Sequence, residues 1–226
     1  MASCEIEIKS LLGSVERTQE VKDALQRLRP ETKKFSHQKQ LNHYFIGGNI
    51  AQLESVLSAY FSTEKQKNFK EIILKGRDFS IRTRRVDNDD PLFVVKVSLD
   101  EGSSHNTVSR MEFESAVEGI SFSELDQLIL DAGFKYQAKW SREREEYKSE
   151  DMTVCFDRNA GYGYIAEFEK IVDDESLAGS ARAELHNVMN VLGVTELPQA
   201  RLERMFAYYN KHWPEYYGTE KIFNIE

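Results

Sequence analysis

The first residues of the chain alternate strictly between charged and apolar side chains, and this pattern constrains the fold more than any other. In Glu5-Ile6-Glu7-Ile8-Lys9 the odd positions are ionisable and the even positions are isoleucines. Successive side chains of a β-strand point to opposite faces, so the pattern predicts a strand with three ionisable groups about 7 Å apart on one face. One such strand on its own also fits an antiparallel sheet with a solvated face.

The same alternation recurs along the chain. Ionisable side chains stand at alternate positions, or between apolar neighbours, at Arg82 and Arg84, Lys96, Arg110, Glu112 and Glu114, Arg142 and Arg144, Asp157, and Glu167 and Glu169. We predict strands over residues 3–11, 40–46, 71–75, 79–86, 92–99, 108–118, 137–148, 152–157 and 163–171. The polar stretches 87–90 and 101–106 are typical of exposed turns, and Gly161-Tyr162-Gly163 is typical of a tight connection between two strands.

Apolar residues spaced three and four apart predict the helices. They follow the capping residues Ser14 and Asn49, run between Ser123 and Gly133, end at Gly193, and begin again near Pro198. The expected fold class is therefore α+β, with an antiparallel sheet and helices packed outside it. We expect one domain over 1–196 and an aromatic-rich helical extension over 197–226 that packs on it.

The recurring charged face distinguishes two arrangements of this sheet. An open sheet would expose the charges to water, whereas a closed barrel would collect them inside, where they require counter-ions. The inventory favours the barrel, because arginines suit bidentate contacts with phosphate oxygens and carboxylates suit Mg²⁺ or Mn²⁺. Carboxylates on a phosphate-binding surface make sense when a cation lies between them and the phosphate. Both sets on one face are what binding of a metal and a triphosphate requires.

Composition excludes several classes of protein. With 40% hydrophobic residues in 226, the chain can bury a core, and its net charge of −8 argues against general nucleic-acid binding. We expect no membrane segment and no signal peptide, because no apolar run has the required length and no basic segment precedes one. Cys4 and Cys155 lack metal-ligand spacing and are expected to be buried thiols in a reducing compartment, which places the protein in the cytoplasm.

The ordered set of motifs resembles the CYTH superfamily, which includes class IV adenylate cyclases, thiamine triphosphatases and inorganic triphosphatases. Glu5-x-Glu7-x-Lys9 resembles the N-terminal ExExK signature of that superfamily. The blocks that follow in the same order are Tyr44-Phe45, Ile81-Arg82-Thr83-Arg84, Val95-Lys96-Val97, Arg110-Met111-Glu112-Phe113-Glu114, Arg142-Glu143-Arg144 with Tyr147, Phe156-Asp157, Gly161-x-Gly163 and Glu167-Phe168-Glu169. The resemblance covers residues 4 to about 171 and implies a closed eight-stranded antiparallel β-barrel, often called a triphosphate tunnel.

The resemblance also implies roles for individual residues. The metal-binding candidates are Glu5, Glu7, Asp157, Glu167 and Glu169, and Glu112 and Glu114 can serve either the metal or the arginines. The phosphate-binding candidates are Arg82, Arg84, Lys96, Arg110, Arg142 and Arg144. Lys9 can contact phosphate or help to activate water, and Lys9 and Glu7 are the candidate catalytic residues. The scattered histidines, including His43, are interpreted as surface or packing residues.

Three functions fit these features. The leading hypothesis is hydrolysis of inorganic tripolyphosphate, a nucleoside triphosphate or thiamine triphosphate, with Mg²⁺ or Mn²⁺ and release of orthophosphate. The alternative is cyclisation of ATP to cyclic AMP and pyrophosphate, which would use the same site. A non-catalytic sensor of polyphosphate or nucleotide is the third. The expected partner is a small-molecule triphosphate, and the architecture is compatible with a homodimer.

Overall fold

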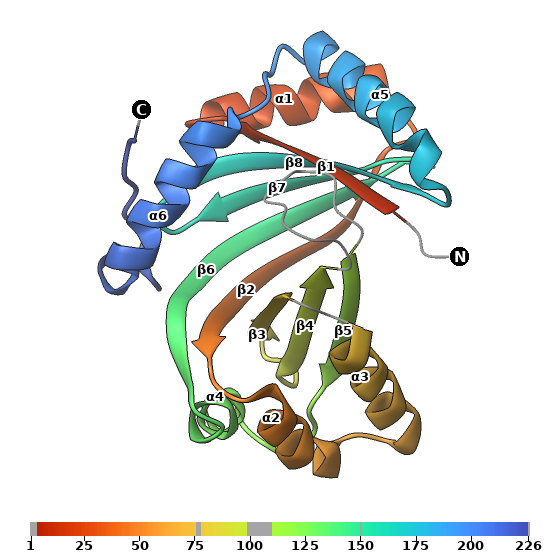
Figure 1. Ribbon diagram of the computed structural model, residues 1–226. Coiled ribbons are helices and arrows are strands. Elements are labelled where there is room, and N and C mark those ends of the chain that lie inside the picture. The colour runs from red at the N-terminus through yellow and green to blue at the C-terminus, as the bar shows by residue number, and fades with distance from the viewer. Residues whose placement is uncertain (1–3, 76–77, 99–109, 150, 226) are drawn as a thin grey trace. The chain divides into compact units, whose positions relative to one another are not determined.

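The computed structural model describes residues 4–75, 78–98, 110–149 and 151–225. Within these residues the chain forms an eight-stranded antiparallel sheet and six α-helices (Figure 1). The order of strands across the sheet is β1 (Cys4–Leu11), β8 (Gly163–Val172), β7 (Thr153–Asn159), β6 (Phe134–Lys148), β2 (Lys33–Gly47), β3 (Asp78–Val86), β4 (Leu92–Ser98) and β5 (Arg110–Ala116). In the described residues the sheet ends at β1 and β5, so the closed barrel that we predicted is not shown.

The chain divides into two compact units. Unit 1 contains the described residues of 1–39 and 141–226, and unit 2 contains those of 40–103 and 108–140. The long strands β2 and β6 each contribute one part to unit 1 and another to unit 2. The boundary that we predicted near residue 196 is a different division and stays a prediction.

Unit 1 has a core between strands and two helices. The apolar positions of β1, Ile6 and Ile8, are fully buried, as is Phe168 of β8. Helices α1 (Val15–Leu28) and α5 (Ala178–Val191) pack against this face (Figure 1) and contribute Val21 and Leu185 to the same cluster. Full burial of each such side chain is worth about 1.5–3 kcal/mol. The apolar half of the alternation therefore faces the helices, which leaves the ionisable half on the opposite face.

The C-terminal residues pack on the connection between β7 and β8. Helix α6 (Gln199–Tyr216) begins after Pro198 and buries Tyr209 fully. After the helix, the backbone N–H of Phe223 donates to the carbonyl of Gly161, and the Phe223 ring lies 5.2 Å from that of Tyr162. The aromatic tail is thus held by ring contacts and by backbone hydrogen bonds.

Unit 2 has a separate core rich in phenylalanine. Helices α2 (Ile50–Leu57), α3 (Thr63–Lys75) and α4 (Phe122–Asp131) pack against β3, β4 and β5. Phe69 of α3 and Phe113 of β5 are stacked, with ring centroids 5.1 Å apart. The Asn49 side chain caps α2 by accepting from two backbone N–H groups, as the sequence predicts.

Two expectations about secondary structure are wrong. The strand predicted over 71–75 belongs to α3, because Phe69 and Ile72 lie three residues apart and share one buried helical face. The cap of α4 is Ser121 rather than Ser123, since Ser121 and Glu124 form a reciprocal capping box. The turn predicted over 87–90 is confirmed, whereas that over 101–106 lies outside the described residues.

Two further expectations concern the cysteines and the membrane. Cys155 is a buried free thiol, and burial raises its pKa, whereas the side chain of Cys4 lies outside the described part. Among the helices described, none combines the length and apolar character that crossing a bilayer requires.

The packing of the C-terminal tail yields a test by substitution. A Cβ at Gly161 would lie 2.7 Å from the Tyr209 ring, and Gly161 has a φ of 85°, whereas Gly13 has a φ of 81° and nothing within 4 Å of its Cβ position. We expect Gly161→Ala to lower the free energy of unfolding in urea by at least about 1 kcal/mol more than Gly13→Ala, because only the former combines backbone strain with overpacking. Equal losses would contradict the packing of Tyr209 on this turn.

Candidate metal and anion site

Three carboxylates of unit 1 gather on the face of β1 and β8 opposite the core. The antiparallel register sets Glu7 of β1 directly against Glu169 of β8, and Glu5 lies two residues before Glu7. Oxygen atoms of all three lie within 4.8 Å of one another. We call this set the acidic cluster. An oxygen-only set of ligands suits Mg²⁺ or Mn²⁺ rather than zinc.

The electrostatics of the acidic cluster favour a bound cation. Burial, together with the charges of Glu167 and Glu5, raises the pKa of Glu169 to about 7 although Arg144 and Lys9 oppose the shift. The ionised form of the Glu169 carboxylate is therefore disfavoured in this environment. A divalent cation among the three oxygens would reverse that balance, because it offsets their mutual repulsion. The residues therefore fit a divalent metal.

Lys9 lies next to the acidic cluster and connects it to the buried part of the face. Its ammonium group forms an ion pair with Glu7 on the same strand and lies 3.3 Å from a carboxylate oxygen of Glu167, its partner on β8. The assigned roles of Lys9 in contacting phosphate or activating water stay predictions. Its contacts show that the side chain balances two carboxylates.

Arg144 of β6 binds two carboxylates from the neighbouring strands. Its Nε and Nη2 each lie 2.7 Å from a different oxygen of Asp157, a bidentate pair, and Nη2 also contacts Glu167. Arg142 adds a bond of 3.0 Å to Asp157. Burial would raise the pKa of Glu167, but Lys9, Arg144 and Arg142 outweigh it and hold that pKa well below its ordinary value. We call Arg142, Arg144, Asp157 and Glu167 the Arg144 network.

The structure brings together most, but not all, of the predicted site residues. Unit 1 joins the acidic cluster, Lys9 and the Arg144 network through the continuous contacts just described. Asp157 and Glu167, which we predicted as metal ligands, accept hydrogen bonds from arginines here and lie outside the group of three carboxylates. Whether they also bind a metal stays a prediction.

Unit 2 carries a second set of predicted residues on β3, β4 and β5. Arg84 donates from Nε to the Asn42 side chain at 3.1 Å and from Nη1 to Glu114 at 3.0 Å. Arg82 donates to the Tyr44 hydroxyl at 3.0 Å, and its guanidinium lies 5.7 Å from the centre of that ring. Lys96 is half-buried on β4. The side chains of Arg110 and Glu112 lie outside the described part of the chain.

Sequence reasoning missed the side chains that hold the arginines of unit 2. Tyr44 was noted only as part of an aromatic pair, and Asn42 was not noted at all. Both stand in β2 directly opposite an arginine of β3, in the pairs Tyr44–Arg82 and Asn42–Arg84. The alternation within β2 indicates that Asn42 and Tyr44 share one face of the strand. The sequence of neither strand gives the register, which is what sets these two residues opposite the arginines of β3.

The described histidines do not form a metal site. His43 is buried, as expected for a packing residue, and His37, His186 and His212 each contact one carboxylate. Among the described residues, the one group whose geometry could hold a metal ion consists of glutamates alone. His105 lies outside them.

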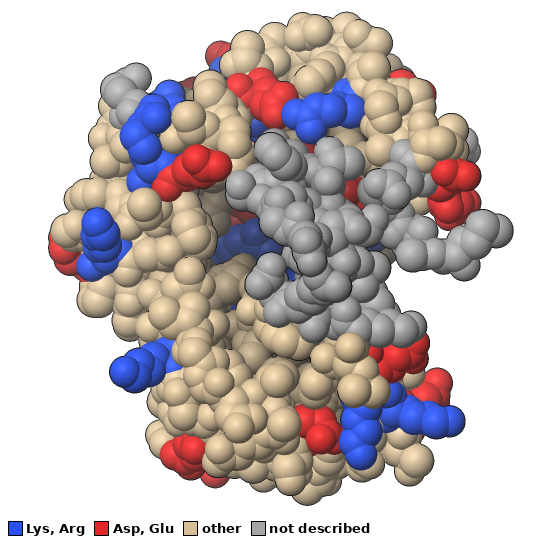
Figure 2. Space-filling model, in the orientation of Figure 1, with Lys and Arg blue, Asp and Glu red and all other residues tan. Residues whose placement is uncertain are grey.

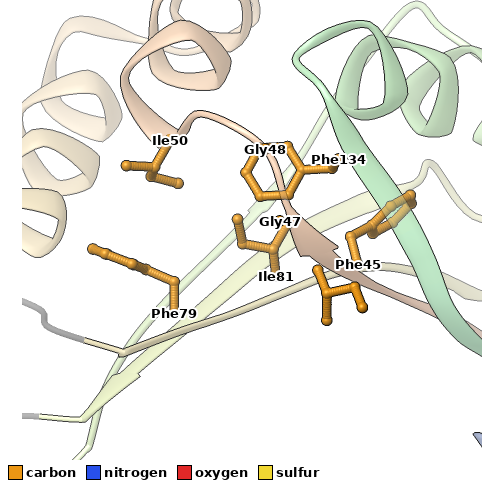
Figure 3. Close-up of a pocket in the computed structure, with 8 residues that line it drawn as sticks. Phe45, Gly47, Gly48, Ile50, Phe79, Ile81 and Phe134 are labelled. Atoms are coloured by element: carbon orange, nitrogen blue, oxygen red, sulfur yellow. The ribbon is translucent and has the colours of Figure 1, made fainter.

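Unit 2 also contains an apolar pocket of about 210 Å³, which Figure 3 shows in close-up. Its lining comprises Phe45, Ile46, Gly47, Gly48, Ile50, Phe79, Ile81 and Phe134. None of these side chains is ionisable, so the pocket offers no charged side chain to a polyphosphate. On the face drawn in Figure 2, acidic and basic side chains are interspersed. A site for an anion on that face would therefore depend on which cationic side chains lie close together locally.

Comparisons with known proteins identify the fold. A family model described as the CYTH domain matches residues 3–201. The PH1012 protein of Pyrococcus horikoshii is 20% identical, with a TM-score of 0.57, and the match covers 85% of this chain and 92% of that one. A "putative adenylate cyclase" from Vibrio parahaemolyticus is 11% identical, with a TM-score of 0.56 and coverage of 86% and 91%. At such identities the solved structures show a common fold alone. No curated protein sequence matches the chain.

The acidic cluster yields a test of metal binding. We expect Glu169→Gln and Glu7→Gln each to weaken binding of Mn²⁺ at least about tenfold, or roughly 1.4 kcal/mol, because each removes a charged ligand. Isothermal titration calorimetry measures the affinity. Glu184→Gln is the matched control, since Glu184 pairs with Lys170 at the surface and lies outside the cluster. Wild-type affinity in both cluster variants would remove the assignment.

Proposed function

We propose that this chain, which belongs to the CYTH domain family of triphosphatases and class IV adenylate cyclases, is a divalent-metal-dependent hydrolase of a triphosphate. Inorganic tripolyphosphate, a nucleoside triphosphate and thiamine triphosphate are the candidate substrates, and orthophosphate is the released product. One observation carries the proposal. The acidic cluster and the Arg144 network are in continuous contact on one face of unit 1, through Lys9 and Glu167.

The contacts of unit 1 support this proposal because they place a group of carboxylates next to a group of guanidinium side chains. The acidic cluster supplies carboxylate oxygens for Mg²⁺ or Mn²⁺, and the Arg144 network supplies guanidinium groups for phosphate oxygens. A bound divalent cation would supply positive charge that stabilises the developing negative charge of the transferred phosphoryl group. Catalysis would then be mostly positioning and electrostatic stabilisation.

Each residue of unit 1 has a distinct part in the proposal. Arg142 and Arg144 would turn part of their hydrogen bonding from Asp157 to the phosphate chain and hold it in line for attack. Lys9 would bind a phosphate oxygen once Glu7 is engaged by a cation and no longer serves as its partner. Glu167, held ionised by three basic groups, would keep the Arg144 guanidinium oriented. We also propose that Arg82 and Arg84 of unit 2 bind phosphate.

The products of the reaction test the proposal. The purified protein is incubated with Mg²⁺ or Mn²⁺ and, separately, with tripolyphosphate, ATP and thiamine triphosphate, and the products are resolved by chromatography. Orthophosphate that depends on the metal and is absent with Glu169→Gln is the expected result. Cyclic AMP with pyrophosphate would instead identify an adenylate cyclase. Tight binding of a triphosphate without any product would identify a sensor.

Arg84 provides a test of how the polyphosphate is recognised. We expect Arg84→Ala to weaken binding of tripolyphosphate by at least about tenfold, and binding of orthophosphate by much less, because an arginine that reads a longer chain contributes little to a single phosphate. Equilibrium dialysis measures both affinities.

Arg85→Ala is the matched control for that substitution. Arg85 is the next residue of the same strand, and its guanidinium lies over the Phe122 ring, 5.5 Å from the centre, on the face that packs against α4. Loss of the two affinities to the same extent in Arg84→Ala, or an equal effect of Arg85→Ala, would mean that Arg84 does not read the chain.

A further inference from the structure

Asp126 of α4 is a buried carboxylate that accepts hydrogen bonds from three strands of unit 2. Its Oδ1 accepts from the Thr83 hydroxyl of β3 at 2.7 Å. Its Oδ2 lies 2.6 Å from Nδ1 of His43 on β2 and accepts from the Tyr136 hydroxyl of β6 at 2.7 Å. Asp126, His43 and Thr83 are all buried. Nothing in the proposed function uses this group, although an aspartate is seldom buried to this extent.

Two of the three strand residues that Asp126 contacts are cross-strand partners of each other. His43 lies directly opposite Thr83 in the register of β2 and β3. The side chain of Asp126 therefore connects β2 and β3 to α4 through two residues that lie opposite each other in the sheet. Hydrogen bonds of a carboxylate are strong and directional. These bonds therefore constrain the orientation of β2 and β3 relative to α4 as well as their distance from it.

The residues next to these two partners carry the basic face of unit 2. Thr83 stands between Arg82 and Arg84, and His43 stands between Asn42 and Tyr44. Neighbouring residues of a strand point to opposite faces. The bonds from Asp126 on one face therefore determine how the arginines and their two holding side chains are presented on the other.

Docking of α4 does not itself require a buried carboxylate. The helix has a capping box at its N-terminus, and Leu125 and Ile129 are fully buried in the phenylalanine-rich core. Apolar side chains of similar volume stabilise such contacts as well as buried polar groups, or better. A buried polar group with three partners from three strands is suited to fixing one arrangement among several that the apolar core would accept.

We propose that Asp126 is a positioning residue, which acts through Thr83 and His43 to set the orientation of Arg82 and Arg84 for a polyphosphate. The inference rests on the proposed function in so far as these arginines bind phosphate. Asp126 touches no substrate in this account. Its contribution is that the guanidinium groups are already in place before the anion arrives, which lowers the entropic cost of binding.

Four variants separate positioning from stability. Thr83→Val removes the hydroxyl and keeps the shape, and Thr83→Ser restores the hydroxyl. Asp126→Asn keeps the shape but replaces one acceptor oxygen by a donor. Ile129→Ala is the matched control, because it weakens the packing of the same helix without touching the polar group. The melting temperature of each variant shows whether Ile129→Ala loses at least as much stability as Thr83→Val.

Two readouts are measured on each variant: the affinity for tripolyphosphate by calorimetry, and the NMR signal of the Arg84 Nε–H, assigned with Arg84→Lys. We expect Thr83→Val and Asp126→Asn to weaken binding about tenfold and to shift or broaden the Arg84 signal, since its bond to Asn42 would no longer be held. Thr83→Ser and Ile129→Ala should retain the affinity and the signal of the wild type.

The outcomes distinguish this inference from the proposed function. If Thr83→Val and Asp126→Asn behave like Ile129→Ala in both readouts, Asp126 is a structural anchor and the inference is overturned. If the wild-type protein binds none of tripolyphosphate, ATP and thiamine triphosphate, the proposed function fails. The Arg84 signal then decides the inference alone: a signal unchanged in Thr83→Val overturns it, and a selective change supports the positioning.

Discussion

Two buried carboxylates, Asp157 and Glu167, set the conditions that the rest of unit 1 meets. A buried carboxylate is costly unless charged donors surround it, and removing one partner from such a pair costs about 3–5 kcal/mol. Arg144 meets this requirement for both at once, and Arg142 and Lys9 complete the set. Stability alone does not explain the arrangement, because apolar residues in the same places would stabilise the fold equally well. The proposed binding of a metal and a phosphate chain would account for it.

The period of two in the strands connects that requirement to the fold. Ile6 and Ile8 of β1 and Phe168 of β8 face α1 and α5, so Glu5, Glu7, Lys9, Glu167 and Glu169 share the other face. In β2 and β3 the same rule sets His43 and Thr83 toward α4 and Tyr44 and Arg82 away from it. Helices α1 and α5 thus pack behind the candidate site of unit 1, and α4 is bonded through Asp126 to the strands that carry Arg82 and Arg84.

The sequence predicts the strands and helices well where a pattern is local. The alternation in residues 5–9 and the capping residues Ser14 and Asn49 are confirmed because strand period and capping depend on neighbours in the chain. The expected strand at 71–75 is wrong. The β-branched side chains of Ile72 and Ile73 favour a strand, but burial of Phe69 and Ile72 on one helical face outweighs that preference. A short apolar run does not carry enough periodicity to decide between the two.

The site was predictable in its composition but not in its pairing. The glutamates of β1 and β8 were predicted as one class of metal ligand, which stays a prediction. Only the register of the two strands shows that Glu5, Glu7 and Glu169 come together while Glu167 contacts Arg144. Asp126 could not be found from the sequence, because a polar residue in an amphipathic helix is ordinarily exposed and its three partners lie 10 to 83 positions away.

The position of a bound cation tests the central claim most directly. Crystals of the protein grown with Mn²⁺ and tripolyphosphate would be measured for the anomalous scattering of manganese. The account predicts a peak within coordination distance, about 2.0–2.2 Å, of carboxylate oxygens from Glu5, Glu7 and Glu169, with phosphate oxygens on its other side. Manganese bound elsewhere, or a polyphosphate bound with no metal at these three residues, would contradict it.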